Sequence, residues 1–162
     1  MNREKEQSGQ KIGNLTYREI QAPLAACLIR GFADAIGRDR AMEIASAAIQ
    51  ADARAAGRSM AERFGGNTLA ELARIVRELW AENGALEIRI HRETDRELCF
   101  DVLRCRYAEL YDRLSMKELG FCLSCNRDEP FLKGFNPDLE MVRTQTIMEG
   151  APLCDFRFHF SK

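Results

Sequence analysis

The sequence lacks an excess of charge of either sign. Its 162 residues carry 24 basic and 25 acidic side chains, for a formal net charge of −1. A phosphate backbone is bound by a basic stripe, so this balance argues against a nucleic-acid partner. No apolar run approaches the roughly 18 residues that a membrane span needs, so we expect no membrane partner. The first six residues also lack the apolar stretch of a secretory signal, and we therefore expect a cytoplasmic protein.

Repeats and low-complexity segments are missing as well, which leaves an ordinary globular composition with 46% hydrophobic and 30% charged residues. A chain of this length can bury an adequate core without disulfides or metals. Residues 1–14 are polar and aperiodic, and we expect them to form a flexible tail. Residues 15–162 are expected to form a single domain, with a helical part at 15–84 and a sheet part at 85–162.

Alanine dominates the first part of this domain. It accounts for 13 of the 35 residues from 22 to 56, and alanine is the best helix former. Pro23 fits only in a first turn, so we expect the first helix to begin near it. Gly37 predicts a break, and Gly57 predicts a helix end. The predicted apolar face of the first helix consists of Ile20, Leu24, Cys27, Leu28 and Phe32.

Helix signals recur further along the chain. Residues 68–71 (TLAE) and 115–118 (SMKE) have the spacing of capping boxes and predict the starts of two more helices. Asn83-Gly84 predicts the end of the first of these, and residues 105–114 are helical in pattern. A loop is expected within 126–137, because Asn, Asp, Gly and Pro gather there.

The hydrophobic period changes from 3.6 to 2 after residue 85, as it does in strands with one buried face. Alternation at 86–90 and 98–102 predicts an antiparallel hairpin that turns near Thr94. Two more strands are expected, around 139–148 and 154–160. The pattern as a whole predicts an α+β fold in which an N-terminal helical layer packs on a roughly four-stranded antiparallel sheet.

Five of the six cysteines follow position 98, and a reducing cytoplasm would keep them as thiols. Cys122 and Cys125 form one C-x-x-C pair, but a structural zinc site usually needs two such pairs. The neighbouring Arg127 would favour the nucleophilic thiolate of Cys125, whereas the end of a helix would disfavour it. Packing and chemistry therefore both stay open for these cysteines.

A second candidate site lies on the polar face of the last two predicted strands. Asp155, Arg157 and His159 alternate with the apolar side chains of the final strand, and Arg143 belongs to the strand before it. If these strands pair as a hairpin, an arginine, an acid and a histidine come close together. Such a face is either a site for a carboxylate and for proton transfer or a solvated surface with cross-strand charge pairs.

An ordered series of short motifs runs through the C-terminal part of the chain. It consists of CNRD at 125–128, GFNP at 134–137, RTQT at 143–146, Gly150, and CDFR at 154–157. This series resembles the L-2-amino-thiazoline-4-carboxylic acid hydrolase family, and so does the layout of a helical first part before an α+β tail. The resemblance implies a hydrolase that adds water to a cyclic amidine/thiazoline carboxylate and opens the ring to an N-carbamoyl amino acid.

Residue types within the matched motifs suggest how such a reaction is divided. An arginine would bind the substrate carboxylate, an acid would hold or protonate the amidine, and water or a thiolate would attack the amidine carbon. The candidate catalytic residues are Cys125, Asp128, Cys154 and Asp155. The candidate substrate-binding residues are Asn126, Arg143, Thr146, Arg157 and His159.

Two other functions fit the same residues. A small-acid-binding or metal-binding module would use Cys105, Cys125 and Cys154 without turnover, and three thiolates with an open fourth position would suit a divalent metal as cofactor. A structural or interaction protein would instead place these cysteines in the core. The partner expected for the hydrolase is a small-molecule carboxylate, and the sequence leaves the oligomeric state open.

Overall fold

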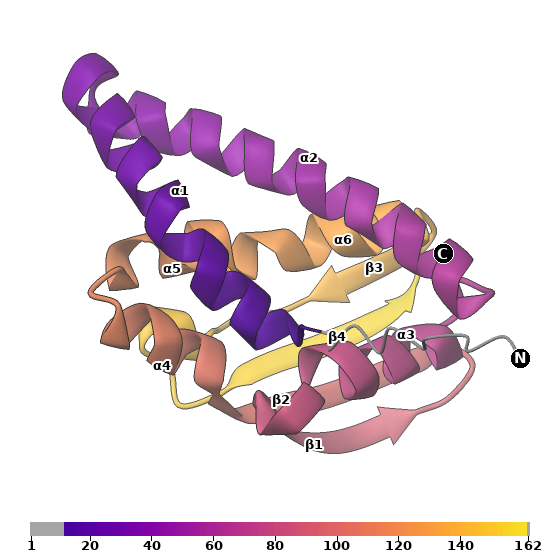
Figure 1. The fold of residues 1–162 in the computed structure, drawn as a ribbon. Helices are drawn as coiled ribbons and strands as arrows, with labels where there is room; N and C mark the ends of the chain where they lie inside the picture. Colours follow the sequence, from indigo (N-terminus) through magenta and orange to yellow (C-terminus); the bar gives the residue numbers. More distant parts are fainter. Residues whose placement is uncertain (1–11, 162) are drawn as a thin grey trace, which may run out of the picture.

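A computed structural model describes residues 12–161 and has the predicted α+β architecture. Four strands form one antiparallel sheet in the order β1-β2-β4-β3. The helices, with short 3-10 and π-helical turns labelled η, lie on one face of it (Figure 1). In chain order the elements are α1 (Asn14–Ile36), α2 (Arg38–Phe64), α3 (Leu69–Ile75), η1 (Val76–Trp80), η2 (Glu82–Gly84), β1 (Leu86–Glu93), β2 (Glu97–Cys105), α4 (Arg106–Arg113), α5 (Lys117–Leu123), η3 (Cys125–Arg127), α6 (Asp128–Phe135), β3 (Leu139–Val142), η4 (Ile147–Glu149) and β4 (Cys154–Phe160).

The core has two parts that meet under the long helices. One lies between the sheet and the helices α2, α3 and α6, where Leu72, Phe100 and Phe158 are fully buried. The other joins α1 to α4 and α5 around Ala26 and Tyr111. Both the helical part and the sheet part of the sequence contribute to the burial of apolar surface, which is the main force that holds such layers together.

Helix α1 differs from its prediction in where it begins and in which face it buries. It starts at Asn14, so Pro23 lies in its interior rather than in its first turn. The helix tolerates Pro23 because the proline is on the exposed side, while Ala22, Ala26 and Ile29 anchor the opposite side. The predicted apolar face is also wrong, because all five of its residues are exposed. No helix in residues 12–161 is both long and apolar enough to cross a membrane.

Helix α2 confirms the predicted break at Gly37, whose φ is 87°, but it does not end at Gly57. Gly57 lies within α2 because α6 packs directly against it: a Cβ there would lie 2.1 Å from the carbonyl oxygen of Phe131. Gly134 makes the reciprocal approach to the backbone of α2, with a Cβ position 2.0 Å from the Arg54 oxygen. Both glycines are therefore needed for close helix packing rather than for helix termination.

The two predicted capping boxes have different outcomes. At 68–71 the box forms, because the Thr68 hydroxyl accepts from the Ala70 N–H and Glu71 accepts from the Thr68 N–H. At 115–118 it does not form: Ser115 has a φ of 54°, and helix α5 starts at Lys117 without a side-chain cap. Glu118 instead pairs with Arg30 of α1 at 2.6 Å, which is a tertiary contact that the local pattern does not contain.

The predicted β1–β2 hairpin is confirmed, and its turn is closed by the Thr94 N–H, which donates to the Glu97 carbonyl. The loop expected at 126–137 is wrong, since η3 and α6 occupy most of it. Asp128 opens α6 and Pro130 lies in its first turn, both favourable positions, and Phe131 and Phe135 bury its inner side. The strand expected to reach residue 148 ends at Val142.

Candidate active site

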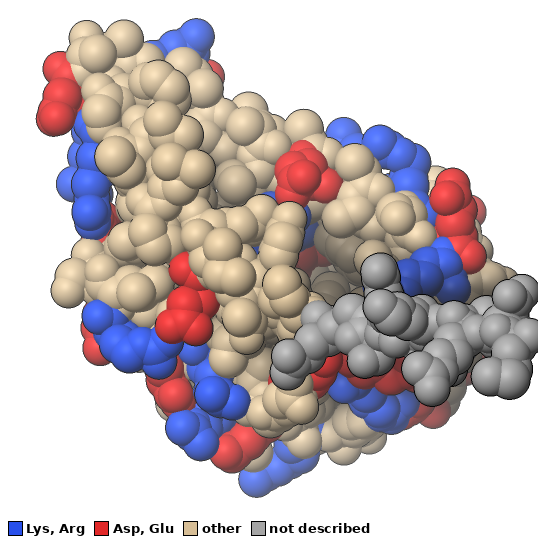
Figure 2. Space-filling model, in the orientation of Figure 1, with Lys and Arg blue, Asp and Glu red and all other residues tan. Residues whose placement is uncertain are grey.

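A cavity of about 310 Å³ opens between the N-terminal end of α1, the C-terminal half of α2 and the inner face of the sheet. Figure 2 shows a recess between the two long helices with charged side chains in it. Its walls are aromatic: the Trp80 ring centroid lies 5.5 Å from that of Phe131 and 6.4 Å from that of Phe156. A hollow of this size with apolar walls and a few polar groups is typical of small-molecule sites.

One buried ion pair stands in the wall of this cavity. Asp128 at the start of α6 accepts a hydrogen bond from Nη1 of Arg143, which follows β3. Nη2 of Arg143 donates to the Cys125 carbonyl at 3.2 Å, and its guanidinium lies 5.2 Å from the centroid of the Phe156 ring. The Arg143 side chain is only 8% exposed, and its buried Nε has no hydrogen-bond partner within residues 12–161. Arg143 is thus held rigidly with one N–H donor to spare.

The carboxyl group of Asp128 is the most chemically distinctive group in the cavity. Burial disfavours its charged form and raises its pKa to about 6, although Arg143 and Arg127 both act in the opposite direction. A carboxyl group with this pKa is mostly ionised at neutral pH, yet it accepts a proton far more readily than an exposed aspartate. These are the properties of a general base that operates near pH 7.

The three thiols of the alternative hypothesis, Cys105, Cys125 and Cys154, also line this cavity. Burial raises the pKa of all three, to about 11 for Cys105, and the nearby Asp128 carboxylate raises that of Cys125 further. The Cys154 sulfur accepts a hydrogen bond from the Ile147 N–H at 3.2 Å. Protonated thiols are poor nucleophiles and poor ligands. In the part of the chain that the structure describes, no three side chains of metal-ligand type are placed to hold an ion together.

Three further arginines line the cavity, namely Arg18, Arg63 and Arg127. Among them only Arg127 stands out in the sequence, as the neighbour of Cys125. Arg18 of α1 lines the cavity with Nη1 bound to Gln21 at 3.2 Å, and Arg127 lines it while pairing with Asp52 at 2.5 Å. Burial, and after it the charge of Arg127, lowers the pKa of Arg18, so an anion near Arg18 would be favourable. The Arg18–Arg127 corner therefore carries surplus positive charge. Arg18, one of two arginines in α1, belongs to no motif in the sequence.

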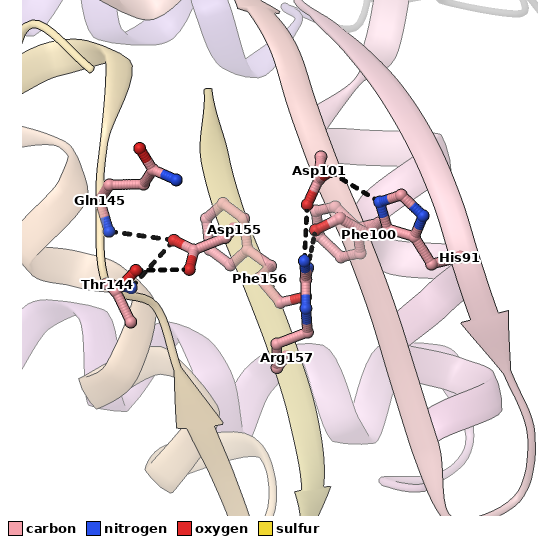
Figure 3. Close-up of polar contacts among 8 residues, drawn as sticks. All are labelled: His91, Phe100, Asp101, Thr144, Gln145, Asp155, Phe156 and Arg157. Atoms are coloured by element: carbon pink, nitrogen blue, oxygen red, sulfur yellow. Dashed lines mark hydrogen bonds and ion pairs between the residues drawn. The ribbon is translucent and has the colours of Figure 1, made fainter. Parts of the chain in front are cut away.

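Asp155 lies outside the cavity, on the opposite face of the sheet (Figure 3). Its carboxylate accepts from the N–H groups of Thr144 and Gln145 at 2.9 and 3.0 Å and from the Thr144 hydroxyl at 2.6 Å. Burial opposes ionisation, but these hydrogen bonds outweigh it and lower the pKa of Asp155. Asp155 therefore fixes the backbone that follows Arg143, and it ends the β3 ladder at Val142.

Arg157 and His159 also lie away from the cavity. Arg157 donates to Asp101 at 2.8 Å, and Asp101 contacts His91 at 2.7 Å on its other oxygen, as Figure 3 shows. His159 is 3.4 Å from Glu140 across the β3–β4 pair. The predicted hairpin of these strands is confirmed, but the predicted meeting of Arg143 with Asp155 and His159 is wrong. Arg143 lies past the end of β3, where the chain turns toward the cavity.

Asn126 and Thr146 hold the backbone around the cavity without lining it. Asn126 of η3 bonds to Ser46 at 2.7 Å and to Gln50 at 2.9 Å, both in α2. Thr146 is buried and caps η4 by accepting from the Glu149 N–H. Of the nine candidate site residues, the structure brings Cys125, Asp128, Arg143 and Cys154 together at one cavity.

A family model matches residues 17–158, and its description is L-2-amino-thiazoline-4-carboxylic acid hydrolase. This chain belongs to that family. The match reaches every element from α1 to β4, and it includes all of the cavity-lining residues except Ile12 and Asn14. No curated protein and no solved structure matches the chain. Its membership of the L-2-amino-thiazoline-4-carboxylic acid hydrolase family indicates that the protein is a hydrolase.

Proposed function

We propose that this protein hydrolyses a cyclic amidine that carries a carboxylate, of the 2-amino-thiazoline-4-carboxylate type, to an N-carbamoyl amino acid. One observation carries the proposal: an aromatic cavity holds a carboxyl group, Asp128, with a pKa of about 6 against the buried Arg143. The family supports hydrolysis of such a ring. The partner is then a small-molecule carboxylate, and we expect the reaction to take place in a reducing cytoplasm.

Arg18 would bind the substrate carboxylate, and Arg127 would add positive charge beside it. The RTQT motif also offers Arg143 for this role, but Asp128 already neutralises the charge of Arg143. Arg157 is bound to Asp101 outside the cavity. Within residues 12–161, the corner formed by Arg18 and Arg127 has two cationic groups and one ion-paired carboxylate, Asp52, so it can accept a monoanion without leaving a buried charge unpaired.

Water would be the nucleophile. Asp128 takes one proton from water as the water oxygen bonds to the amidine carbon, and the bond from that carbon to the ring sulfur then breaks. Asp128 returns its proton to the departing sulfur, and the second proton of water moves to the ring nitrogen as the carbonyl forms. The product is heavier than the substrate by one water and carries a new thiol.

Two features favour this sequence over the alternatives with thiols. The pKa of Cys125 and that of Cys154 are both raised by burial, so neither supplies a thiolate readily at neutral pH. The absence of a suitable three-ligand group within residues 12–161 gives no support to a metal-binding module built from the three cysteines. Incubation with substrate distinguishes turnover of a small acid from binding alone.

The test is incubation of the purified protein with 2-amino-thiazoline-4-carboxylate, followed by mass spectrometry and by titration of new thiol. We expect a product heavier by one water. Asp128→Asn should lower kcat by about 10²- to 10⁴-fold, the usual contribution of a general base. The matched control Asp112→Asn changes an exposed aspartate of α4 and should keep full activity. Binding of the substrate without any product would instead identify a small-acid-binding module.

The carboxylate site is tested separately with Arg18→Gln. Loss of this guanidinium should raise KM about 10-fold or more and leave kcat nearly unchanged, because it binds ground and transition states alike. Arg30→Gln is the matched control, since Arg30 is on the same helix but pairs with Glu118 away from the cavity. An unchanged KM in Arg18→Gln would show that the carboxylate binds elsewhere.

A further inference from the structure

The outward face of α1 carries a continuous row of large apolar side chains. Two further large side chains are about half exposed, namely Tyr17 at the N-terminal end of the helix and Ile44 in the second turn of α2. Figure 2 shows mostly uncharged surface along this helix, with charged side chains at the margins of the tip that it forms with α2. Single exposed apolar residues are normal on a soluble protein, but a contiguous row of this length marks an interaction surface. The row consists of Ile20, Leu24, Leu28, Phe32 and Ile36, which are 50–67% exposed.

The spacing of this row is that of a packing ridge. Residues four apart on a helix line up in ridges inclined about −26° to its axis. Directly beside the ridge runs a parallel row of small exposed side chains, Pro23, Cys27, Gly31 and Ala35. A Cβ added at Gly31 would meet nothing within 4 Å, so this second row is an open groove. A ridge and an adjoining groove on one helix can each receive the other from a neighbouring helix.

We propose that this face of α1 binds the same face of a second copy of the chain, related by a two-fold axis that passes near Leu28. The ridge is symmetric about Leu28, because Leu24 and Phe32 lie one step away and Ile20 and Ile36 lie two. An antiparallel copy thus brings the central side chains of the two ridges, Leu24, Leu28 and Phe32, side by side, with each ridge in the groove of the other copy. Ridges of this class interlock at a crossing angle of about −50°. Neither row contains a charged residue that would repel its counterpart.

The available area is consistent with a dimer. Five large side chains that are half exposed or more supply on the order of 500 Å² of apolar surface. A stable interface buries roughly 800 Å² per partner, and Tyr17, Ile44 and the groove add to the five. An isologous pair is also the commonest arrangement of soluble oligomers. This interface does not depend on the proposed reaction, and it is measured in the absence of substrate.

The oligomeric state of the full chain tests the proposal, by sedimentation or by light scattering after gel filtration. We expect twice the chain mass of 18.4 kDa at micromolar concentration. Leu28→Glu and Leu28→Lys should each be monomeric with unchanged circular dichroism, because Leu28 is half exposed and touches the core little. An equimolar mixture of the two variants should form the dimer again, since residue 28 of one copy faces residue 28 of the other.

Two controls separate this face from other surfaces. Leu103→Glu charges an exposed leucine of β2 and should leave the dimer intact. Gly31→Leu fills the groove with a side chain whose Cβ meets nothing within 4 Å in one copy, so it should weaken the dimer at least tenfold without lowering the helix content. A wild-type monomer, or a dimer that both Leu28 variants retain, would overturn the proposal. Binding of a monomeric wild type to lipid vesicles would assign the face to a membrane surface instead.

Discussion

Burial changes the pKa values of a few side chains in the cavity, and the proposed chemistry depends on these changes. Asp128 is an ordinary aspartate in sequence, but its position at the cavity wall raises its pKa to about 6. The same burial raises the pKa of the surrounding thiols, because a thiolate also loses its hydration. Burial therefore brings the pKa of the Asp128 carboxyl group closer to pH 7, which suits the proposed role as a base. The same burial takes the pKa values of the thiols further from pH 7.

The pH dependence of kcat/KM follows from this value. In the proposed reaction Asp128 acts as a base only when it is ionised, so protonation at low pH should remove activity. Because its pKa is about 6, kcat/KM should fall about tenfold per pH unit below pH 6. An exposed aspartate would keep activity to about pH 4. A steady-state profile from pH 4.5 to 8 checks this, and a flat profile down to pH 4.5 would exclude Asp128 as the base.

Cys125 provides the complementary prediction. We expect Cys125→Ser to keep kcat within about threefold, because the native thiol stays protonated and does not attack the substrate. Its backbone carbonyl, which accepts from Arg143, is retained in the variant. Steady-state kinetics on protein with an unchanged melting temperature make the comparison. A loss of 100-fold or more would restore the covalent thiol mechanism.

At the scale of elements, helices α2 and α6 approach each other closely at two glycines. Gly57 and Gly134 let the two helices approach until a Cβ on either would overlap the backbone of the other. This approach positions the start of α6, and therefore Asp128, against the cavity. The glycines are thus packing residues whose role depends on a segment more than 70 residues away in sequence.

Gly57→Ala should consequently lower the free energy of unfolding by about 1–3 kcal/mol, the usual cost of overpacking. The added Cβ would lie 2.1 Å from a backbone oxygen that cannot move without shifting α6. Gly31→Ala is the control, because its Cβ meets nothing and alanine favours a helix over glycine by roughly 0.5–1 kcal/mol. Urea unfolding monitored by circular dichroism measures both. Equal effects of the two substitutions would contradict the close contact.

At the scale of the whole molecule, the cavity is assembled from both parts of the chain. Arg18 and Trp80 come from the helical part, whereas Asp128 and Phe156 come from the sheet part. In addition, α1 contributes two different surfaces, since its N-terminal turns line the cavity while its outward ridge is exposed.

Mass action gives a prediction for the dimer at this scale. If α1 binds a second copy, dilution must destabilise the folded chain, and the melting temperature should fall by several degrees as protein concentration drops 100-fold. Leu28→Glu should melt at a temperature that does not depend on concentration. Differential scanning fluorimetry over this range is sufficient. A concentration-independent wild type would indicate that the monomer accounts for all of the stability.

The amino-acid sequence alone predicted the fold class, the family, the β1–β2 hairpin and the capping box at Thr68, because these depend on local periodicity, on side-chain spacing and on an ordered motif series. It raised the β3–β4 pairing as a condition, and the structure meets that condition. It also indicated Asp128 and Arg143, since both lie in those motifs. The tertiary structure alone decided which faces are buried. In the structure the apolar row of α1 is exposed and Arg18 lines the cavity. Asp155 and Arg157 lie on the face of the sheet opposite the cavity. The reason is physical: burial and its effect on pKa depend on what packs against a residue, and α6, α2 and α1 meet only once the chain has folded.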